Sequence, residues 1–183
     1  MAPLRKANAY SKRKVVPYTR KSKKKAKSYI KTVPPQKIVK FAMGNQTSLN
    51  EGKLTYQLTV ISQEACQIRH NALEACRQYF NKKLNKETSG QFVLKIIPFP
   101  HHIQRENKMI TGAGADRMQT GMQLSFGKAM GKSAIVKKNT PLFFVAVQNP
   151  KAVTFARHVL KQVKSKLPGK TRVEYVDKTK KKE

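Results

Sequence analysis

The first carboxylate side chain of this chain belongs to Glu51, and fourteen lysines or arginines lie before it within residues 1–40. A segment with so many like charges and so few apolar residues cannot build a core of its own. Four prolines further discourage a continuous helix, namely Pro3, Pro17, Pro34 and Pro35. We therefore predict a basic N-terminal extension over residues 1–36 that is ordered by a polyanionic partner. A solvated or signal-bearing tail is the alternative interpretation.

The rest of the chain is also basic, because its 25 lysines and arginines outnumber its nine acidic residues, and the whole chain has a formal charge of +30. Phosphates of RNA or DNA are the natural counter-charges, since contacts from Lys and Arg release condensed counterions. A membrane is disfavoured because the longest apolar run, Leu142–Val147, is far shorter than the roughly 20 residues of a spanning helix. With two cysteines and no apolar segment typical of a secretory signal, an intracellular protein is expected.

Globular patterning begins near Ile38 and defines a predicted domain over residues 37–177, followed by a basic tail over residues 178–183. Apolar or alternating runs predict strands at 38–43, 54–60, 92–98, 133–136, 142–147 and 173–176. Asn149 and Pro150 are residue types that begin a helix. The buried face of this helix should comprise Val153, Ala156, Val159 or Leu160, Val163 and Leu167.

A second helix is predicted to begin at Ser62, a residue type that often caps helices. Its apolar stripe would comprise Ala65, Ile68, Ala72, Cys76, Tyr79, Phe80 and Leu84. Cys66 and Cys76 would then lie roughly 15 Å apart on one helix, and we expect both to be small core residues. Strands outnumber helices, and both helices can pack on one sheet face. The sequence therefore predicts an α+β fold, a two-layer domain with two helices on a mixed sheet.

Residues 100–133 separate two predicted strands and show neither helical nor alternating periodicity. A compact domain seldom contains so long an irregular connection unless it is functional or disordered. This stretch holds five of the nine glycines, four of the six methionines, and the basic residues Arg105, Lys108, Arg117, Lys128 and Lys132. Glycine permits close backbone approach, and basic residues can follow a phosphate backbone. We predict a functional loop that contacts nucleic acid, with methionines that either line the contact or fill a small core.

Nucleotide-binding motifs fail in this loop on spacing. Gly127 lies one position too close to Gly131-Lys132-Ser133 for a phosphate-binding loop. The run Gly112-Ala113-Gly114 is followed by Arg117 where a dinucleotide-binding fingerprint has its third glycine. No nucleotide cofactor is expected.

Metal and acid–base sites are not indicated either. His101 and His102 are adjacent, so in an extended stretch they point in opposite directions, and no spaced set of ligands completes a site. Glu106 and Asp116 could form a catalytic pair, but Arg117 would keep Asp116 ionised, which favours a structural clamp. We expect no metal, no cofactor and no enzymatic activity.

The loop carries a family resemblance. Its motifs are His101-His102-Ile103, Arg105-Glu106-Asn107-Lys108-Met109, Gly112-Ala113-Gly114-Ala115-Asp116-Arg117, Thr120-Gly121-Met122 and Phe126-Gly127-Lys128. With Pro17-Tyr18-Thr19-Arg20 and Met43-Gly44-Asn45, they closely resemble the large-subunit ribosomal protein family called L-sixteen in bacteria and L-ten-e in archaea and eukaryotes. The Gly-Ala-Asp-Arg version of the loop matches the archaeal and eukaryotic branch. The resemblance spans about residues 17–176, and the lysine run 21–27 looks inserted relative to the family pattern.

The resemblance implies a structural constituent of the large ribosomal subunit, with an α/β-hammerhead domain and a cytoplasmic location in the ribosome. The implied partners are large-subunit rRNA near the aminoacyl-tRNA site and peptidyl-transferase centre, the acceptor end of tRNA, and neighbouring ribosomal proteins. No membrane contact and no free homo-oligomer are expected. The loop residues implied to lie near tRNA are His101, His102, Arg105, Lys108, Met109, Gly112, Ala113, Gly114, Asp116, Arg117, Gly121 and Met122.

Binding to rRNA is expected to come from the extension and the basic body of the domain. The residues predicted to contact rRNA are Arg5, Lys12, Arg13, Lys14, Tyr18, Arg20, Lys21, Lys23, Lys24, Lys25, Lys27, Lys37, Lys40, Lys128 and Lys132. Two other function classes are alternatives. A DNA-packing architectural protein would share the charge but would not need the glycine-rich loop, and an RNA-modifying enzyme would need a cofactor or catalytic pair.

Overall fold

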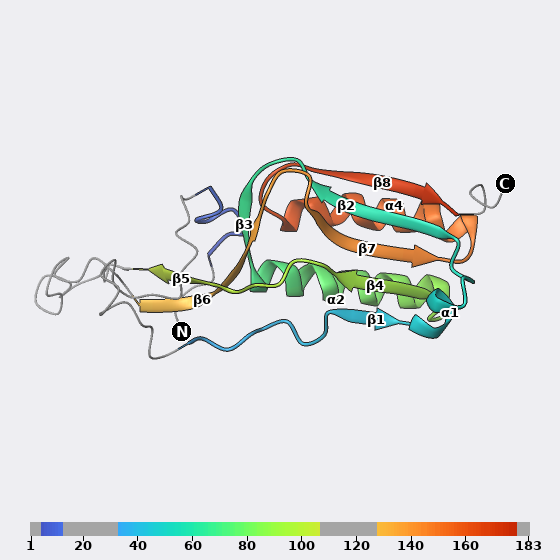
Figure 1. Ribbon diagram of the computed structural model, residues 1–183, viewed down its shortest axis with the longest axis horizontal. Coiled ribbons are helices and arrows are strands. Elements are labelled where there is room, and N and C mark those ends of the chain that lie inside the picture. Colours follow the sequence, from blue (N-terminus) through green and yellow to red (C-terminus); the bar gives the residue numbers. More distant parts are fainter. Residues whose placement is uncertain (1–4, 13–32, 107–127, 179–183) are drawn as a thin grey trace, which may run out of the picture.

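A computed structural model describes residues 5–12, 33–106 and 128–178 of the chain (Figure 1). The elements occur in the order β1 (Ala42–Gly44), α1 (Gln46–Asn50), β2 (Tyr56–Ser62), β3 (Cys66–Arg69), α2 (His70–Thr88), β4 (Phe92–Ile96), β5 (His102–Glu106), β6 (Lys128–Val136), β7 (Pro141–Val147), α4 (Pro150–Val163), the 3-10 helix η2 (Lys164–Lys166) and β8 (Thr171–Asp177). In the described part of the chain, no helix is both long and apolar enough to cross a membrane.

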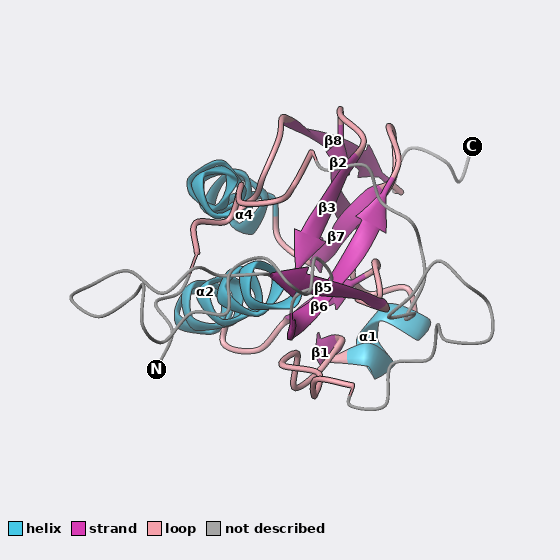
Figure 2. Ribbon diagram, turned by 90° about the vertical axis from the view of Figure 1, so that its left-hand side faces the viewer, coloured by secondary structure: helices cyan, strands magenta, loops and turns pink. Residues whose placement is uncertain are grey.

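Five strands form the larger sheet in the order β1-β4-β7-β2-β8, and α2 and α4 lie side by side on one of its faces (Figure 2). The predicted α+β class with two helices against a sheet is confirmed. The prediction of a mixed sheet is wrong, because all described strand pairs are antiparallel. β2 and β4 run in the same direction, but β7 inserts between them and runs against both. No parallel neighbours therefore arise in this sheet.

The core lies between the larger sheet and the two helices. Along β7, Phe143, Val145 and Val147 alternate toward the helices and belong to one buried apolar cluster. Phe143 meets Phe80 of α2 edge-on, with ring centroids 5.2 Å apart. The predicted face of α4 is also confirmed, because Val153, Ala156, Val159, Leu160, Val163 and Leu167 are all buried. Asn149 precedes this helix and Pro150 begins it, as predicted.

The helix predicted to start at Ser62 starts eight residues later, at His70. Ser62 ends β2, and its hydroxyl donates to the carbonyl oxygen of Glu64 at 2.7 Å, which turns the chain instead of capping a helix. Residues 66–69 then form β3, which pairs with β6. Cys66 therefore lies in a strand and Cys76 in α2, so their predicted placement on one helix is wrong. Both cysteines are buried, as predicted.

Gly44 is the last residue of β1, and Asn45 follows it. Gly44 has a positive φ of +91°, and a Cβ atom there would lie 1.9 Å from the carbonyl oxygen of Phe92. Only glycine permits this close approach of the two chains. Asn45 then caps the short helix α1, since its side-chain oxygen accepts a hydrogen bond from the amide of Ser48 at 3.1 Å. The sequence patterns did not predict α1.

The stretch 100–133 is not irregular throughout. Its two ends pair as the antiparallel strands β5 and β6, in a register that places His102 opposite Ser133 and Glu106 opposite Lys128. A bulge between Gln104 and Arg105 breaks the alternation, which explains why the sequence showed no strand pattern there. With β3 these strands form a second sheet, in the order β3-β6-β5. The tip of the predicted loop, residues 107–127, lies outside the described residues.

Candidate nucleic-acid interface

The hairpin of β5 and β6 projects from the end of the domain, beyond the ends of the larger sheet and of both helices (Figure 1). Because Glu106 pairs with Lys128, residues 107–127 leave and rejoin the fold at one point, the end of this hairpin. β3 connects the hairpin to the start of α2, so the smaller sheet joins the projecting strands to the two-layer core.

A buried polar cluster fixes the base of the hairpin. The side-chain oxygen of Gln67 on β3 accepts hydrogen bonds from the Gln104 amide at 3.0 Å and from the Ser133 hydroxyl at 3.1 Å. These three residues come from the three strands of the smaller sheet and are 3%, 9% and 0% exposed, respectively. A satisfied network of buried polar groups admits few alternative arrangements. The direction of the hairpin is therefore set by specific hydrogen bonds.

The N-terminal segment 5–12 lies against this sheet, although it belongs to the predicted extension. The backbone amide of Gln67 donates to the carbonyl of Ser11 at 3.0 Å, and the Arg69 guanidinium donates to the carbonyl of Arg5 at 3.3 Å. Arg5 also forms an ion pair with Glu106 at the end of β5, and its Nε lies 2.9 Å from that carboxylate. Glu106 is thus a structural partner of Arg5.

His70 forms the joint between α2 and the hairpin. It is 2% exposed, and a Cβ atom added to Gly131 of β6 would lie 3.0 Å from its Nε2, so the ring packs directly on that glycine. Burial, together with the positive charges of Lys37, Arg69 and Lys132, lowers the pKa of His70 to about 4. These three cations come from three separate segments. Their common effect on His70 shows that the fold gathers them around the base of the hairpin.

The paired histidines of the sequence have different surroundings, because His101 is exposed and His102 is partly buried. Burial lowers the pKa of His102, and the nearby charges of Arg105 and His101 act in the same direction. Arg105 therefore adds a fourth cation to the end of the molecule that carries the hairpin. Within the described ranges, no group of three or more His, Cys, Asp or Glu side chains is arranged to hold a metal ion.

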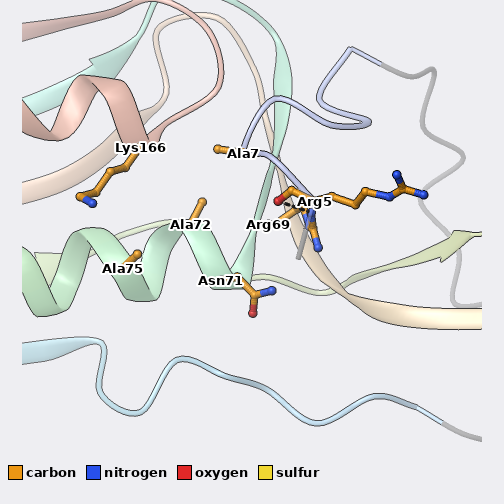
Figure 3. Close-up of a pocket in the computed structure, with 7 residues that line it drawn as sticks. All are labelled: Arg5, Ala7, Arg69, Asn71, Ala72, Ala75 and Lys166. Atoms are coloured by element: carbon orange, nitrogen blue, oxygen red, sulfur yellow. Dashed lines mark hydrogen bonds between the residues drawn. The ribbon is translucent and has the colours of Figure 1, made fainter. Parts of the chain in front are cut away.

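A small pocket opens beside this region (Figure 3). Ala7 faces Ala72 and Ala75 of α2 across it, with Lys166 on one side and Arg5 and Arg69 on the other. Its volume is about 200 Å³, below the roughly 300–1,000 Å³ that is typical of sites for small molecules. Its lining is mainly apolar, and its size does not indicate a cofactor site.

The structure brings several predicted residues together at one end of the domain. Arg5, Lys37, Arg105 and Lys132 surround the base of the hairpin with His102, while Lys12 lies 3.8 Å from the carboxylate of Glu64. Lys40 is exposed on the segment before β1, and Lys128 begins β6. The remaining predicted residues lie outside the described ranges: Arg13, Lys14, Tyr18, Arg20, Lys21, Lys23, Lys24, Lys25, Lys27, Lys108, Met109, Gly112, Ala113, Gly114, Asp116, Arg117, Gly121 and Met122.

Three residues of this region were not predicted. Gln67 and Arg69 were assigned to the helix predicted to begin at Ser62, but they lie in β3. Lys166 follows α4 in the short helix η2 and appeared as one more lysine near a helix end. Only the pairing of β3 with β6, which joins positions more than sixty residues apart, brings Gln67 and Arg69 to the hairpin. No local pattern signals such a pairing.

Comparison with known proteins gives a consistent result. Residues 14–174 match the family model described as ribosomal protein L16p/L10e. The chain belongs to the L16p/L10e family. A relative from Methanospirillum hungatei JF-1, named large ribosomal subunit protein uL16, is 44% identical over 146 residues, which cover 79% of this chain and 83% of the relative. Relatives of the same name from Saccharolobus islandicus strain L.S.2.15 and Saccharolobus solfataricus P2 are each 40% identical over 176 residues, covering 95% of this chain and 93% of theirs.

Family membership confirms the resemblance read from the loop motifs. The L16p/L10e match includes the larger sheet, both long helices and the hairpin, because it extends from residue 14 to residue 174. The segment 5–12, which contacts β5 through Arg5 and β3 through Ser11, lies before the matched residues. The longer Saccharolobus alignments cover 95% of the chain. The comparisons therefore concern almost the whole chain.

Proposed function

We propose that this chain is a structural constituent of the large ribosomal subunit in the cytoplasm, and that it binds large-subunit rRNA without catalysing a reaction. The observation that carries this proposal is the cluster of cations from four segments around the projecting hairpin, namely Arg5, Lys37, Arg69, Arg105 and Lys132. Cations fixed on a folded surface can match the spacing of RNA phosphates. The names of the family relatives support the same proposal.

The finer part of the proposal concerns tRNA. The residues between Glu106 and Lys128 are inferred to approach the acceptor end of tRNA near the aminoacyl-tRNA site and peptidyl-transferase centre, because the hairpin would present them away from the rRNA-binding body. The polar cluster at Gln67 would hold the direction of that approach. In this arrangement the protein acts on tRNA by positioning. Residues 1–36 and 178–183 would serve as extensions that bind rRNA and neighbouring proteins, and residues 5–12 would do so from their place against the smaller sheet.

The proposal is tested by sedimentation of the tagged protein with cellular ribosomal subunits. We expect it to migrate with the large subunit. Recovery with chromosomal DNA, together with a preference for duplex DNA over structured rRNA at equal salt, would overturn the proposal.

The contribution of the cation cluster is tested by replacing Lys37 and Lys132 with alanine. Each lost phosphate contact should weaken rRNA binding and reduce the slope of log affinity against log salt by about 1. The matched control replaces Lys151 and Lys161, two exposed lysines on α4, which changes the net charge equally at a site away from the hairpin. Equal effects of the two double variants would show that total charge, not the hairpin cluster, determines binding.

The tRNA part has a separate test in the deletion of residues 111–115, which lie outside the described ranges. We expect the shortened protein to join the large subunit and to impair tRNA binding or peptide synthesis. Failure to join the subunit would instead assign these residues to assembly.

A further inference from the structure

Two extended segments form an apolar strip at one edge of the domain. The first, residues 33–41, leads into β1, and the second, residues 95–100, includes the end of β4 and its continuation toward β5. They lie side by side, since the amide of Ile96 donates to the carbonyl of Phe41 at 2.7 Å and the Gln36 side chain donates to the carbonyl of Pro100 at 3.3 Å. Figure 1 shows the first segment running along the margin of the molecule before it enters β1.

The side chains of the second segment alternate between core and solvent. Ile96, Pro98 and Pro100 are buried, whereas Ile97 is 46% and Phe99 is 59% exposed. Phe99 stacks on Phe41 of the first segment, with ring centroids 5.4 Å apart and planes inclined by 26°. The apolar surface continues at Val39, which is 73% exposed, and Val33, which is 49% exposed. Large apolar side chains grouped at the surface in this way indicate a binding surface.

The charges on the strip indicate the chemistry of the partner. Lys37 and Lys40 are exposed on the first segment and Lys95 is partly buried on the second, and neither segment contains an acidic residue. The Glu74 carboxylate accepts a hydrogen bond from the backbone of Val39, but its charge is paired with Arg77. An aromatic ring beside several cations is the arrangement that binds single-stranded nucleic acid, because bases stack on the ring while phosphates meet the cations. A protein partner with an apolar face could cover Phe99, but an apolar face would not neutralise the charges of Lys37, Lys40 and Lys95.

We propose that this strip binds an unpaired RNA nucleotide, with its base stacked on Phe99 and an adjacent phosphate near Lys40, while Lys37 lies between the strip and the cations at the hairpin. The inference rests on the proposed RNA-binding function and adds a second mode of contact to it. The cations around the hairpin would contact the backbone of folded rRNA, whereas the strip would bind a nucleobase that is not paired in an RNA helix. Stacking tolerates any base, so the strip would select unpaired RNA without selecting its sequence.

The chain contains no tryptophan, so the variant Phe99→Trp carries a single fluorescent reporter at the strip. We expect a single-stranded adenylate oligomer to quench this fluorescence and inorganic polyphosphate to leave it unchanged at saturation. Ile135→Trp is the matched control, because Ile135 is 46% exposed on β6 and lies outside the strip. Equal quenching by polyphosphate, or no quenching by bound oligomer, would overturn the stacking proposal.

The affinity test separates this inference from the function on which it rests. Phe99→Ala should lower affinity for the adenylate oligomer by roughly five- to tenfold with an unchanged salt slope, because a stacked base is lost and no phosphate contact is. Affinity for a fully paired RNA helix should not change. If Phe99→Ala binds both RNAs as tightly as the parent protein, the strip is a docking surface for another molecule and the inference fails. If the parent protein itself binds neither rRNA nor the oligomer, the proposed function fails as well.

Discussion

The two sheets of this domain are held in place by different forces. The larger sheet is buried against α2 and α4 through apolar side chains such as Phe143 and Val145, which are at most 1% exposed. The smaller sheet has apolar residues on its core side, but its three strands are also joined by the polar cluster of Gln67, Gln104 and Ser133. Apolar burial is large and non-directional, whereas hydrogen bonds require specific geometry.

This difference suggests a division of roles. The free energy of unfolding should depend mainly on the larger sheet and its helices, because most buried apolar residues lie there. The position of the hairpin should depend mainly on the smaller sheet, whose contacts are few and directional. Variants in the larger sheet should therefore unfold the whole domain, and variants in the smaller sheet should loosen the hairpin while the core remains folded.

The largest effect is expected from Phe143→Ala. Phe143 is fully buried and contacts Phe80, so its removal leaves a cavity between sheet and helix. Such truncations cost about 3–5 kcal/mol, and urea denaturation should show a correspondingly lower midpoint. Ile135→Ala is the control, because Ile135 is 46% exposed and should change stability by no more than about 0.5 kcal/mol. Similar midpoints for the two variants would contradict the role assigned to the larger sheet.

Lowering the pH should destabilise the domain through His70, the residue that lies between α2 and the hairpin. The pKa of His70 is about 4 in the folded chain, against an ordinary value of 6.5. Between these two values the unfolded chain binds a proton at His70 that the folded chain excludes. Stability therefore falls as the pH drops from 6.5 toward 4, by about 2 kcal/mol between about pH 7.5 and about pH 5.

Urea denaturation across this range tests the assignment to His70. His70→Gln should flatten the pH dependence, whatever its effect at neutral pH. The pKa of His102 is also lowered, so a smaller slope of the same sign should remain. His158→Gln, which alters an exposed histidine on α4, should retain the full slope. A slope that survives His70→Gln unchanged would exclude His70 as its source.

The sequence predicted the larger sheet and α4 well, and the smaller sheet poorly, for the same physical reason. Asn149, Pro150 and the apolar stripe of α4 are local signals that act within a few residues. Residues 65–69 also fit a helical stripe, but their backbone pairs with β6, and this long-range pairing overrides the local pattern. The same holds for β5, where the bulge at Gln104 removes the alternation.

Some features of the candidate interface could likewise be predicted from the sequence, and others could not. Its cations were predictable as residue types, because Arg5, Lys37 and Lys132 stand out in a strongly basic chain. The convergence of Lys37, Arg69 and Lys132 on His70 was not predictable, since it requires three distant segments to meet. The roles of Gln67 and of the stacked pair Phe41 and Phe99 also depend on neighbours remote in sequence. The number of basic residues follows from the composition, whereas the positions of their side chains relative to one another follow only from the fold.

A smaller and local effect is expected from Gln67→Leu. The leucine would leave the Gln104 amide and the Ser133 hydroxyl buried without their acceptor, at a cost of about 1–3 kcal/mol. Hydrogen exchange should accelerate at the backbone amides of β5 and β6 before those of β7. Gln57→Leu is the matched control, because Gln57 is only partly buried on β2. If β7 exchanged as fast as β5 in the Gln67 variant, the two sheets would unfold as one unit.

The smallest effect is expected from Arg5→Ala, which removes the ion pair between the N-terminal segment and Glu106. The Arg5 side chain is 43% exposed, so water and salt screen its side of the pair, whereas the Glu106 side chain is only 8% exposed and would lose a counter-charge with little water to replace it. The urea midpoint should therefore fall slightly, by less than in Gln67→Leu. Exchange should accelerate only at the end of β5, where Glu106 lies, and high salt should produce the same change in the parent protein.

Two variants sharpen this last comparison. Arg5→Lys retains the charge but cannot place two guanidinium nitrogens on one carboxylate oxygen, so it should restore exchange protection only in part. Arg172→Ala removes a more exposed ion pair, with Glu174 at 2.6 Å within β8, and should leave β5 unchanged. A loss of stability in Arg5→Ala as large as that in Gln67→Leu would mean that the N-terminal segment, and not the buried cluster, holds the smaller sheet together. The segment would then be part of the folded domain in the energetic sense, and the boundary between extension and domain would have to lie before Arg5.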